Sequence, residues 1–411
     1  MLKKQKNFCI APFSQITFAP NGNYSPCPEI GGNPWQIQSG NPKDAWLAQT
    51  FADLRSNFTQ DKKASICNRC WDNEQHGEQS LRRRLFSGVP YKKGLVNYIN
   101  TEQYVSGPKQ INLMVGNKCN LRCRICNPNC SVTFNVEGKY YQEKYKKSNY
   151  YNGKKLDFFS EEQIDQIFKL SKNVVRYEFY GGEPLIDLST LVLLEKLVES
   201  KQSSDITLFY NTNATNEPTP EQLGLWKNFK SIELNLSLDD FGERFNYQRH
   251  PANWKDVLKF IDKLQQNTYD VNFSTRIICT VSIFNVLYLK EIFSEFAKFN
   301  MPIHLNLVQK PDYYSIYNMP FSLKSSIRKK LLDGPDKINF ILSILDSTDI
   351  TYRDTDTNTI SVRKADNNKN YDGEYLDQFI FWTRAKDEYR HEDFSKTFPE
   401  LYELMVNTAR S

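Results

Sequence analysis

Strand-like runs alternate with amphipathic helical runs between residues 110 and 308, and this alternation constrains the fold more than any other feature. β-rich runs that are each followed by a helical pattern indicate βα units and a parallel sheet. The sequence therefore predicts an α/β fold. We expect six strands, at 110–116, 174–180, 205–211, 231–239, 271–282 and 302–308. We expect the intervening helices at 161–171, 187–200, 219–229, 253–266 and 286–299.

The predicted strands carry one polar face each. In 231–239, the apolar residues Ile232, Leu234 and Leu236 alternate with Glu233 and Asn235. A parallel strand covered by helices on both sides should be apolar throughout, so a polar face indicates a wet cavity. The cavity would offer Asn112, Glu178, Tyr180, Asn211, Asn213, Glu233, Asn235, Ser237, Arg276, Thr280, Ser282, His304 and Asn306. Because barrel active sites lie at the carboxyl ends of strands, we expect these near the chemistry: Tyr180, Asn213, Ser237, Asp239, Ser282 and Asn306.

Three cysteines follow the first of these strands directly. Cys119, Cys123 and Cys126 are spaced C-x3-C-x2-C after the apolar run 111–115. Soft thiolates at such close spacing bind zinc or iron–sulfur clusters. A zinc site would need a fourth ligand, for which Cys130 is near enough. A 4Fe–4S cluster held by three thiolates instead leaves one iron open to a small molecule.

The cysteine spacing resembles the signature of the radical S-adenosylmethionine (radical SAM) enzymes. The turn Gly181-Gly182-Glu183-Pro184, which follows the predicted strand 174–180, resembles a second motif of that family. The resemblance implies a partial (β/α)6 barrel similar to a TIM barrel. It also implies that the three cysteines bind a 4Fe–4S cluster whose open iron chelates S-adenosyl-L-methionine. One electron would then cleave this cofactor to a 5′-deoxyadenosyl radical, which abstracts hydrogen from the substrate.

The same resemblance indicates residues that contact S-adenosylmethionine. The Gly-Gly-Glu-Pro turn would face the methionine amino group, with glycines that allow a close backbone approach. Ser237 would contact the ribose and Arg249 the methionine carboxylate, although a surface or capping role for these two is an open alternative. Ile125 stands where the family usually has an aromatic residue, and its backbone could still touch the adenine. The expected cofactor contacts are Ile125, Gly181, Gly182, Glu183, Pro184, Asn213, Ser237 and Arg249.

Four further cysteines lie in residues 1–108, ahead of the predicted sheet: Cys9, Cys27, Cys67 and Cys70. Gly22 and Cys27 are placed as in a hairpin that carries a ligand. This segment resembles the twitch and SPASM extensions that hold an auxiliary 4Fe–4S cluster, although such extensions usually follow the barrel. A structural zinc site is the alternative, and iron–sulfur is preferred because of the neighbouring motif. We expect an N-terminal domain at 1–108, the barrel at 109–312 and a helical extension at 313–411.

Several further residues have candidate roles. Tyr180, His304 and Asn306 are candidates for catalysis, His304 with a hydrogen-bonded structural role as the alternative. Cys279 falls on the apolar face of its strand and should be a buried small hydrophobe. Cys130 is interpreted as a bystander. A helix over 74–86, capped near Ser80, carries three arginines at 82–84 that are interpreted as a solvated face. The Lys-, Tyr- and Asn-rich segment 138–155 should interrupt the helix after the cysteines as a solvated loop.

Composition narrows the class of protein further. Nine cysteines, an odd number in clustered spacings, indicate metal binding and not a secreted disulfide framework. No run approaches the roughly 20 apolar residues of a membrane span, so a cytoplasmic location is expected. A net charge of +5 does not by itself argue for a nucleic-acid partner. The resemblance implies a flavodoxin- or ferredoxin-type electron donor.

The leading hypothesis is a radical SAM oxidoreductase that modifies a peptide or protein oxidatively, by dehydrogenation or a cross-link. One alternative is redox-neutral epimerisation or rearrangement of a small metabolite, sugar or nucleotide. An alternative of another class is a non-catalytic zinc- or nucleic-acid-binding protein, which would leave the Gly-Gly-Glu-Pro turn and the polar strand faces unexplained.

Overall fold

The structure of the 411-residue chain is a computed structural model. It describes residues 6–19, 21–30, 42–75, 80–88, 98–146, 159–308, 310–346, 350–353, 360–363 and 371–410. Two stretches on which predictions bear lie outside these ranges: residues 89–97 of the predicted N-terminal domain, and residues 147–155 of the Lys-, Tyr- and Asn-rich segment.

One mixed sheet of eight strands forms the centre of the molecule, in the order β2-β1-β3-β4-β5-β6-β7-β8. Strands β3 to β8 lie in chain order and pair in parallel. This order is consistent with an open βα barrel, and all six predicted strands are confirmed to within about two residues at their ends. Their bounds are β3 Gln110–Met114, β4 Arg176–Tyr180, β5 Thr207–Thr212, β6 Ser231–Ser237, β7 Phe273–Val281 and β8 Ile303–Leu307.

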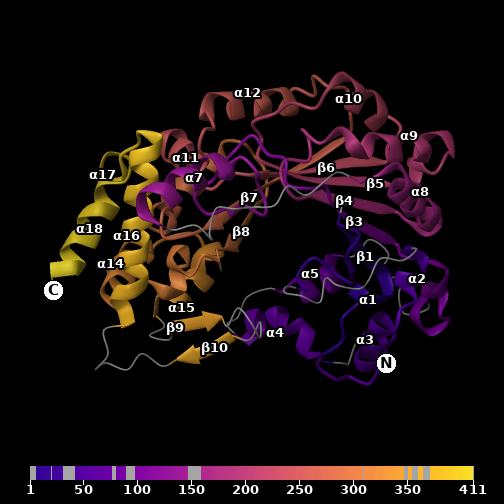
Figure 1. The fold of residues 1–411 in the computed structure, drawn as a ribbon, viewed down its shortest axis with the longest axis horizontal. Helices are drawn as coiled ribbons and strands as arrows, with labels where there is room; N and C mark the ends of the chain where they lie inside the picture. Colours follow the sequence, from indigo (N-terminus) through magenta and orange to yellow (C-terminus); the bar gives the residue numbers. More distant parts are fainter. Residues whose placement is uncertain are drawn as a thin grey trace.

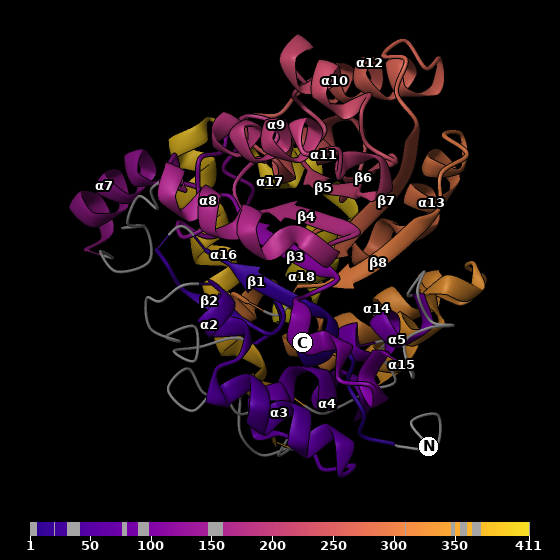
Figure 2. The same cartoon turned by 90° about the vertical axis from the view of Figure 1, so that its right-hand side faces the viewer.

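Helices from the connections between strands cover one face of this sheet (Figures 1 and 2). The first residues of two of them explain where they begin, since Ser160 with Gln163 and Thr219 with Gln222 form capping boxes. The five predicted helices are confirmed, and a short one, α11, is added. The bounds are α8 Glu161–Leu170, α9 Leu191–Glu199, α10 Pro220–Trp226, α11 Gly242–Gln248, α12 Trp254–Gln265 and α13 Leu289–Ala297.

The two faces of the strands differ as the alternation predicts. In β6, Ile232, Leu234 and Leu236 are fully buried in the main hydrophobic core against the helices. Glu233, on the opposite face, keeps 23% of its side chain exposed. The opposite face, called the inner face below, is therefore both polar and partly accessible to solvent.

The N-terminal segment adds two strands to the same sheet. β1 (Gln15–Phe18) pairs in parallel with β3, and β2 (Tyr24–Ser25) pairs antiparallel with β1, which confirms the predicted hairpin before Cys27. Ile16 and Phe18 belong to the main core, so this hairpin is continuous with the sheet. The helices α1 Ala11–Ser14, α2 Pro42–Trp46, α3 Gln49–Thr59, α4 Asn68–Gln75 and α5 Leu81–Gly88 lie on the side of the sheet away from α9, α10 and α12 (Figures 1 and 2).

Three sequence-based expectations about local structure are wrong in whole or in part. The helix predicted over 74–86 is instead two helices, α4 and α5, with Ser80 just before the second. The arginines are only partly a solvated face: Arg83 is exposed as predicted, but Arg82 is buried and ion-paired with Glu74, and Arg84 donates to His304. A helix, α7 (Phe134–Tyr145), does follow the cysteines where an interrupting loop was expected.

The C-terminal part is helical, as predicted, with α14 Phe321–Leu331, α15 Asn339–Asp346, α16 Tyr371–Arg390, α17 Phe394–Thr397 and α18 Pro399–Arg410. A two-stranded sheet of β9 (Ile350–Arg353) and β10 (Ile360–Arg363) was not predicted. α16 contacts α7, and α17 contacts α11, so the extension reaches the region that follows the cysteines. None of the described helices combines the length and the apolar character that crossing a membrane would need.

Candidate functional site

Residues 116–130, called the cysteine loop below, leave the carboxyl end of β3 and bring three thiols together. Cys123 is close enough to Cys119 to raise the pKa of that thiol, and Cys119 and Cys123 both raise the pKa of Cys126. Burial is the main reason that the pKa of Cys119 rises, to about 12. The predicted ligands are therefore placed side by side. As metal ligands they would have to lose their protons, which makes binding pH-dependent.

Cys130 lies beside Cys126, with which it shares a hydrogen bond. The fourth cysteine of the loop is thus adjacent to the predicted ligands, although the sequence interpretation left it aside. Among the residues that the structure describes, no set of three His, Cys, Asp or Glu side chains is arranged around a position for a single metal ion.

The Gly-Gly-Glu-Pro turn packs directly on the cysteine loop. The amide of Gly182 donates to the Gly116 carbonyl at 3.0 Å, and the amide of Glu183 donates to the Lys118 carbonyl at 2.8 Å. A Cβ atom on Gly182 would lie 2.2 Å from the Lys118 oxygen, a distance that no real contact shows. Gly181, at φ +134°, would meet the Gly116 oxygen at 2.6 Å. The glycines are therefore required by the contact between the two loops, a reason that the sequence did not reveal.

Glu183 connects this turn to the end of β5. Its carboxylate accepts hydrogen bonds from the Leu185 amide, the Thr212 hydroxyl and the Asn213 amide, at 3.1, 2.8 and 2.7 Å. The side chain is 1% exposed, and burial raises its pKa to about 7 in spite of these three donors. Glu183 thus fixes the turn against the neighbouring strand.

Asn213 extends the connection to the first cysteine. Its side-chain amide donates to Asn120 Oδ1 at 2.9 Å and lies 3.8 Å from the Cys119 sulfur. The predicted position of Asn213 beside the cofactor end of the sheet is consistent with this contact. Pro184 is buried, and Ile125 packs half-buried against the main core.

Arg249 and Asp239 form a buried ion pair at the end of β6, with Arg249 Nη2 2.8 Å from Asp239 Oδ2. Asp239 also accepts from the Thr280 amide at 2.9 Å, which fixes the carboxylate. The positive charge of Arg249 acts on Cys123, and both Cys123 and Cys126 act on Arg249. Arg249 therefore faces the cysteines, while Ser237 ends β6 in a half-buried position.

The C-terminal extension holds the cysteine loop from its other side through charged residues of α16 and the turn after it, called the C-terminal clamp below. Arg124 is fully buried, stacks on the Tyr247 ring and pairs with Asp387 and Glu392 at 2.5 Å each. Lys386 donates to the Arg124 carbonyl at 3.1 Å. The clamp consists of Lys386, Asp387, Arg390 and Glu392.

The second half of the clamp reaches α7. Arg390 binds both carboxylate oxygens of Glu137 at 2.8 and 3.0 Å and donates to the Arg122 carbonyl at 2.8 Å. The side chains of Arg390 and Glu137 are both 0% exposed. Sequence reasoning missed these residues. The available signal was the run of charges at 386–392 in an otherwise aromatic-rich helix.

The three candidates for catalysis lie on the inner face. The Tyr180 hydroxyl is buried beside Thr17. His304 Nε2 lies 2.9 Å from Arg84 Nη1, and burial and the nearby arginines lower the pKa of His304 to about 4. Asn306 interacts with His304 on the same strand. Cys279 is fully buried and directed at the Asp239 carbonyl, as its strand position predicts.

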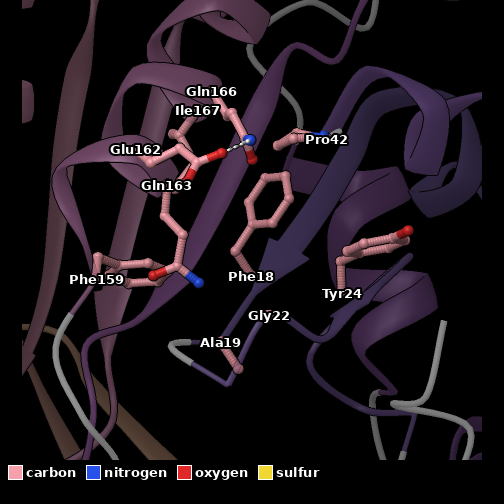
Figure 3. Close-up of a pocket in the computed structure, with 10 residues that line it drawn as sticks. All are labelled: Phe18, Ala19, Gly22, Tyr24, Pro42, Phe159, Glu162, Gln163, Gln166 and Ile167. Atoms are coloured by element: carbon pink, nitrogen blue, oxygen red, sulfur yellow. Dashed lines mark hydrogen bonds between the residues drawn. The ribbon is translucent and has the colours of Figure 1, made fainter. Parts of the chain in front are cut away.

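The four N-terminal cysteines also converge. Cys9, Cys27, Cys67 and Cys70 line one cavity together with Glu29 and Arg82, inside a small hydrophobic core of their own. Burial raises the pKa of all four thiols. A separate cavity of about 360 Å³ lies between the β1–β2 hairpin and α8, lined by Phe18, Tyr24 and Gln163 among others (Figure 3). That cavity contains no cysteine and no member of the site.

The residues of the cysteine loop fit an iron–sulfur cluster. Three adjacent thiols form the donor set, and soft thiolates are the ligands that such clusters require. The loop that carries them is held by the Gly-Gly-Glu-Pro turn, by Asn213 and by the C-terminal clamp. The charge of Arg249 would favour the thiolate form of Cys123.

Comparison with known proteins agrees with this geometry. Residues 113–295 match the model of the Radical SAM superfamily. The chain is 24% identical over 234 residues to the radical SAM cyclopropyl synthase TigE of Paramaledivibacter caminithermalis, which covers 56% of this chain and 47% of TigE. It is 27% identical over 199 residues to the uncharacterised protein MJ0907 of Methanocaldococcus jannaschii, covering 46% and 58%. The chain thus spans about half the length of the curated relatives it matches.

Two solved structures match part of the chain. Native anSMEcpe with bound AdoMet has a TM-score of 0.41 and 19% identity, over 55% of this chain and 59% of that one. SuiB of Streptococcus suis bound to S-adenosylmethionine has a TM-score of 0.39 and 15% identity, over 66% and 60%. At such scores these similarities support no statement about activity. The part of the chain that matches the Radical SAM superfamily model, residues 113–295, contains both the three cysteines of the cysteine loop and the Gly-Gly-Glu-Pro turn.

Proposed function

We propose that the protein is a radical SAM enzyme in which Cys119, Cys123 and Cys126 hold a 4Fe–4S cluster. The observation that carries the proposal is the backbone contact between the cysteine loop and the Gly-Gly-Glu-Pro turn, because it joins the two motifs of the family in one site. When bound there, such a cluster supplies the electron for reductive cleavage of S-adenosylmethionine. The expected contacts with that cofactor are Ile125, Gly181, Gly182, Glu183, Pro184, Asn213, Ser237 and Arg249.

The side chains around the cysteines position the cysteine loop and the Gly-Gly-Glu-Pro turn, and they supply a positive charge beside the thiols. Asp239 holds the Arg249 guanidinium beside the cysteines, where it can pair with a carboxylate. Glu183 aligns the turn through its three hydrogen bonds. The C-terminal clamp holds the backbone of the cysteine loop on the far side, so that the thiols remain adjacent. Rigid supporting groups of this kind are what a reactive site requires.

The reaction that we propose is an oxidative modification of a peptide or protein, a dehydrogenation or a cross-link. This rests on the four N-terminal thiols, which we assign to a second 4Fe–4S cluster of the twitch or SPASM type. Four thiolates would saturate that cluster, leaving it suited to carry away an electron. The shared cavity supports a common ligand for the four residues. A single zinc ion is the alternative, and the described side chains are not arranged around a position for one ion.

The positions of the cysteines support the oxidative reaction over a thiol-quenched epimerisation. Such an epimerisation needs a thiol near the substrate that can give up a hydrogen atom. Seven cysteines belong to the cysteine loop and the N-terminal set described above. Cys130 is hydrogen-bonded to Cys126, and Cys279 is buried and directed at the Asp239 carbonyl. We therefore assign none of the nine cysteines to the role of hydrogen-atom donor.

Counting metal in anaerobically reconstituted protein tests this assignment. We expect about eight irons per chain in the wild type and about four in a Cys67→Ala/Cys70→Ala variant. The matched variant Cys119→Ala/Cys126→Ala should also retain about four, with loss of S-adenosylmethionine cleavage in that variant alone. Four irons and one zinc in the wild type would refute the second cluster and would favour redox-neutral chemistry.

A further inference from the structure

Four polar residues form a row across the inner face of the sheet, one step before the cofactor end. Asn211 is in register with Asn235, and Asn235 with Arg276. Tyr180 directly follows the paired residues Phe179 and Tyr210, so it stands level with Asn211. Residues in register on parallel strands point to the same face. The side chains of Tyr180, Asn211, Asn235 and Arg276, called the polar row below, therefore lie side by side across β4, β5, β6 and β7.

The inner face on the amino-terminal side of the row is filled by charges that satisfy one another. Arg176 lies between two carboxylates, 2.7 Å from Glu178 and 2.9 Å from Glu233, and it stacks on the Phe209 ring. Both carboxylates are thus engaged by Arg176. This cluster of Arg176, Glu178 and Glu233 lies next to the polar row, on the same face of the sheet.

The side-chain oxygen of Asn235, in the polar row, is a hydrogen-bond acceptor without a partner among the described residues. Its side-chain nitrogen donates to Asn211 Oδ1 at 2.9 Å, which directs Asn235 Oδ1 the other way. That oxygen is buried and has no partner among the described residues, in a residue that is only 7% exposed. Because an unpaired buried acceptor is costly, the position calls for a donor from a bound molecule. At the other end of the row, the Tyr180 hydroxyl lies beside Thr17.

Arg276 places a positive charge beside this open acceptor. The carboxylate that pairs with it, Glu233, is 3.6 Å away and is already held more closely by Arg176. The Arg276 side chain is 45% exposed. His304, the titratable group on the next strand, is uncharged near neutral pH because burial, Arg84 and Arg276 lower its pKa to about 4. The charge of Arg276 is therefore only partly compensated by these groups.

We propose that the polar row binds a carboxylate-bearing residue of the peptide substrate, with its amide N–H on Asn235 Oδ1 and its carboxylate on Arg276. The proposal rests on the proposed function, because it assumes a peptide. Neighbouring strands lie about 4.8 Å apart, so one amino-acid residue reaches both groups. The row that contains Asn213 and Ser237 lies two residues further along the strands, about 6.6 Å away. The bound residue would thus lie directly beneath the expected cofactor.

The test is selection from a peptide library without turnover. Reconstituted protein with S-adenosylmethionine, but no reductant, is incubated with N-acetylated hexapeptides that are randomised at every position. One half of the library has free carboxyl termini and the other half has amidated termini, and bound peptides are read by mass spectrometry. The variants are Arg276→Gln and the charge reversal Arg276→Glu. Lys259→Glu, on the exposed side of α12, is the matched control for charge.

We expect about tenfold enrichment of peptides with a carboxylate, which corresponds to one charge-assisted hydrogen bond. Enrichment confined to the free-acid half would identify the carboxyl terminus, and enrichment of Asp or Glu in both halves would identify a side chain. Arg276→Gln should lose the preference, Arg276→Glu should favour Lys and Arg, and Lys259→Glu should select as the wild type does.

Captured peptides without a carboxylate preference, or a preference that Arg276→Glu leaves unchanged, would overturn this inference while the proposed function stands. Capture of no peptide would overturn it as well. Release of deoxyadenosine by wild-type protein without peptide tests the radical SAM assignment separately. A failure of the carboxylate-binding inference can therefore be distinguished from a failure of the proposed function.

Discussion

Replacing Arg390 by Met should release the cysteine loop from the C-terminal clamp. The substitution removes three hydrogen bonds, two to Glu137 and one to the Arg122 carbonyl, and it leaves a carboxylate with no exposed surface. Removing one partner of a buried ion pair costs about 3–5 kcal/mol. Arg122 Nε remains 3.0 Å from Glu137 and offsets part of this loss, so we expect the lower end, about 3 kcal/mol.

Hydrogen exchange of the loop amides measures this effect locally. The amides of Arg122 and Arg124 donate to the carbonyls of His250 and Gln248 at 2.7 Å each, so both report whether the loop opens. A loss of about 3 kcal/mol in the free energy of opening should accelerate their exchange about a hundredfold. Lys263→Met is the control, because its ion pair with Glu217 is exposed and should contribute less than about 1 kcal/mol.

A double variant separates the ion pair from simple loss of packing. Arg390→Met combined with Glu137→Leu removes both buried charges, so it should be less destabilised than the sum of the two single variants by about 1 kcal/mol or more. Unchanged exchange at Arg122 and Arg124 in Arg390→Met, or strict additivity in the double variant, would refute the clamp as an account of how the loop is held.

Three more predictions follow from single residues. Gly182→Ala should displace the cysteine loop and lower both the thermal midpoint and the iron content, because the added Cβ would meet the Lys118 oxygen. Gly224→Ala, whose Cβ would have nothing within 4 Å, should be neutral or stabilising. Equal effects of the two substitutions would contradict the contact between the loops. Glu183→Gln should lower the free energy of unfolding by about 1–3 kcal/mol, measured in urea, because one carboxylate oxygen becomes a donor facing donors; an unchanged midpoint would argue against its bridging role. His304→Gln should flatten the fall in stability between pH 6.5 and pH 4, since the lowered pKa means that the unfolded chain takes up a proton there before the folded one; a pH profile identical to the wild type would contradict this.

Much of the sheet could be predicted because its signals are local. In β6 the alternation of Ile232, Leu234 and Leu236 with polar residues fixes both the strand and the face that it buries. Ser160 and Thr219 similarly give the starts of two helices. The cysteine spacing and the Gly-Gly-Glu-Pro turn resemble the motifs of the radical SAM enzymes, and residues 113–295 match the model of that superfamily.

The unpredicted parts depend on contacts between distant segments. Arg124 meets Asp387 across 263 positions, and nothing near either residue indicates the other. The pairing of β1 with β3 joins residues 15–18 to 110–113, which composition cannot reveal. A run of arginines usually faces solvent, so the sequence predicts a solvated Arg82. In the structure Arg82 is buried and donates hydrogen bonds to the Glu74 carboxylate and the Phe8 carbonyl, which its neighbours in sequence do not indicate.

The central claim, that Cys119, Cys123 and Cys126 bind the cluster that cleaves S-adenosylmethionine, is tested most directly by deoxyadenosine release. Anaerobically reconstituted protein is given dithionite and S-adenosylmethionine, and the product is quantified for the wild type and for Cys123→Ala. We predict release by the wild type and none above background by Cys123→Ala. Wild-type protein that binds no iron and releases no deoxyadenosine under these conditions, or a Cys123→Ala variant as active as the wild type, would contradict the claim.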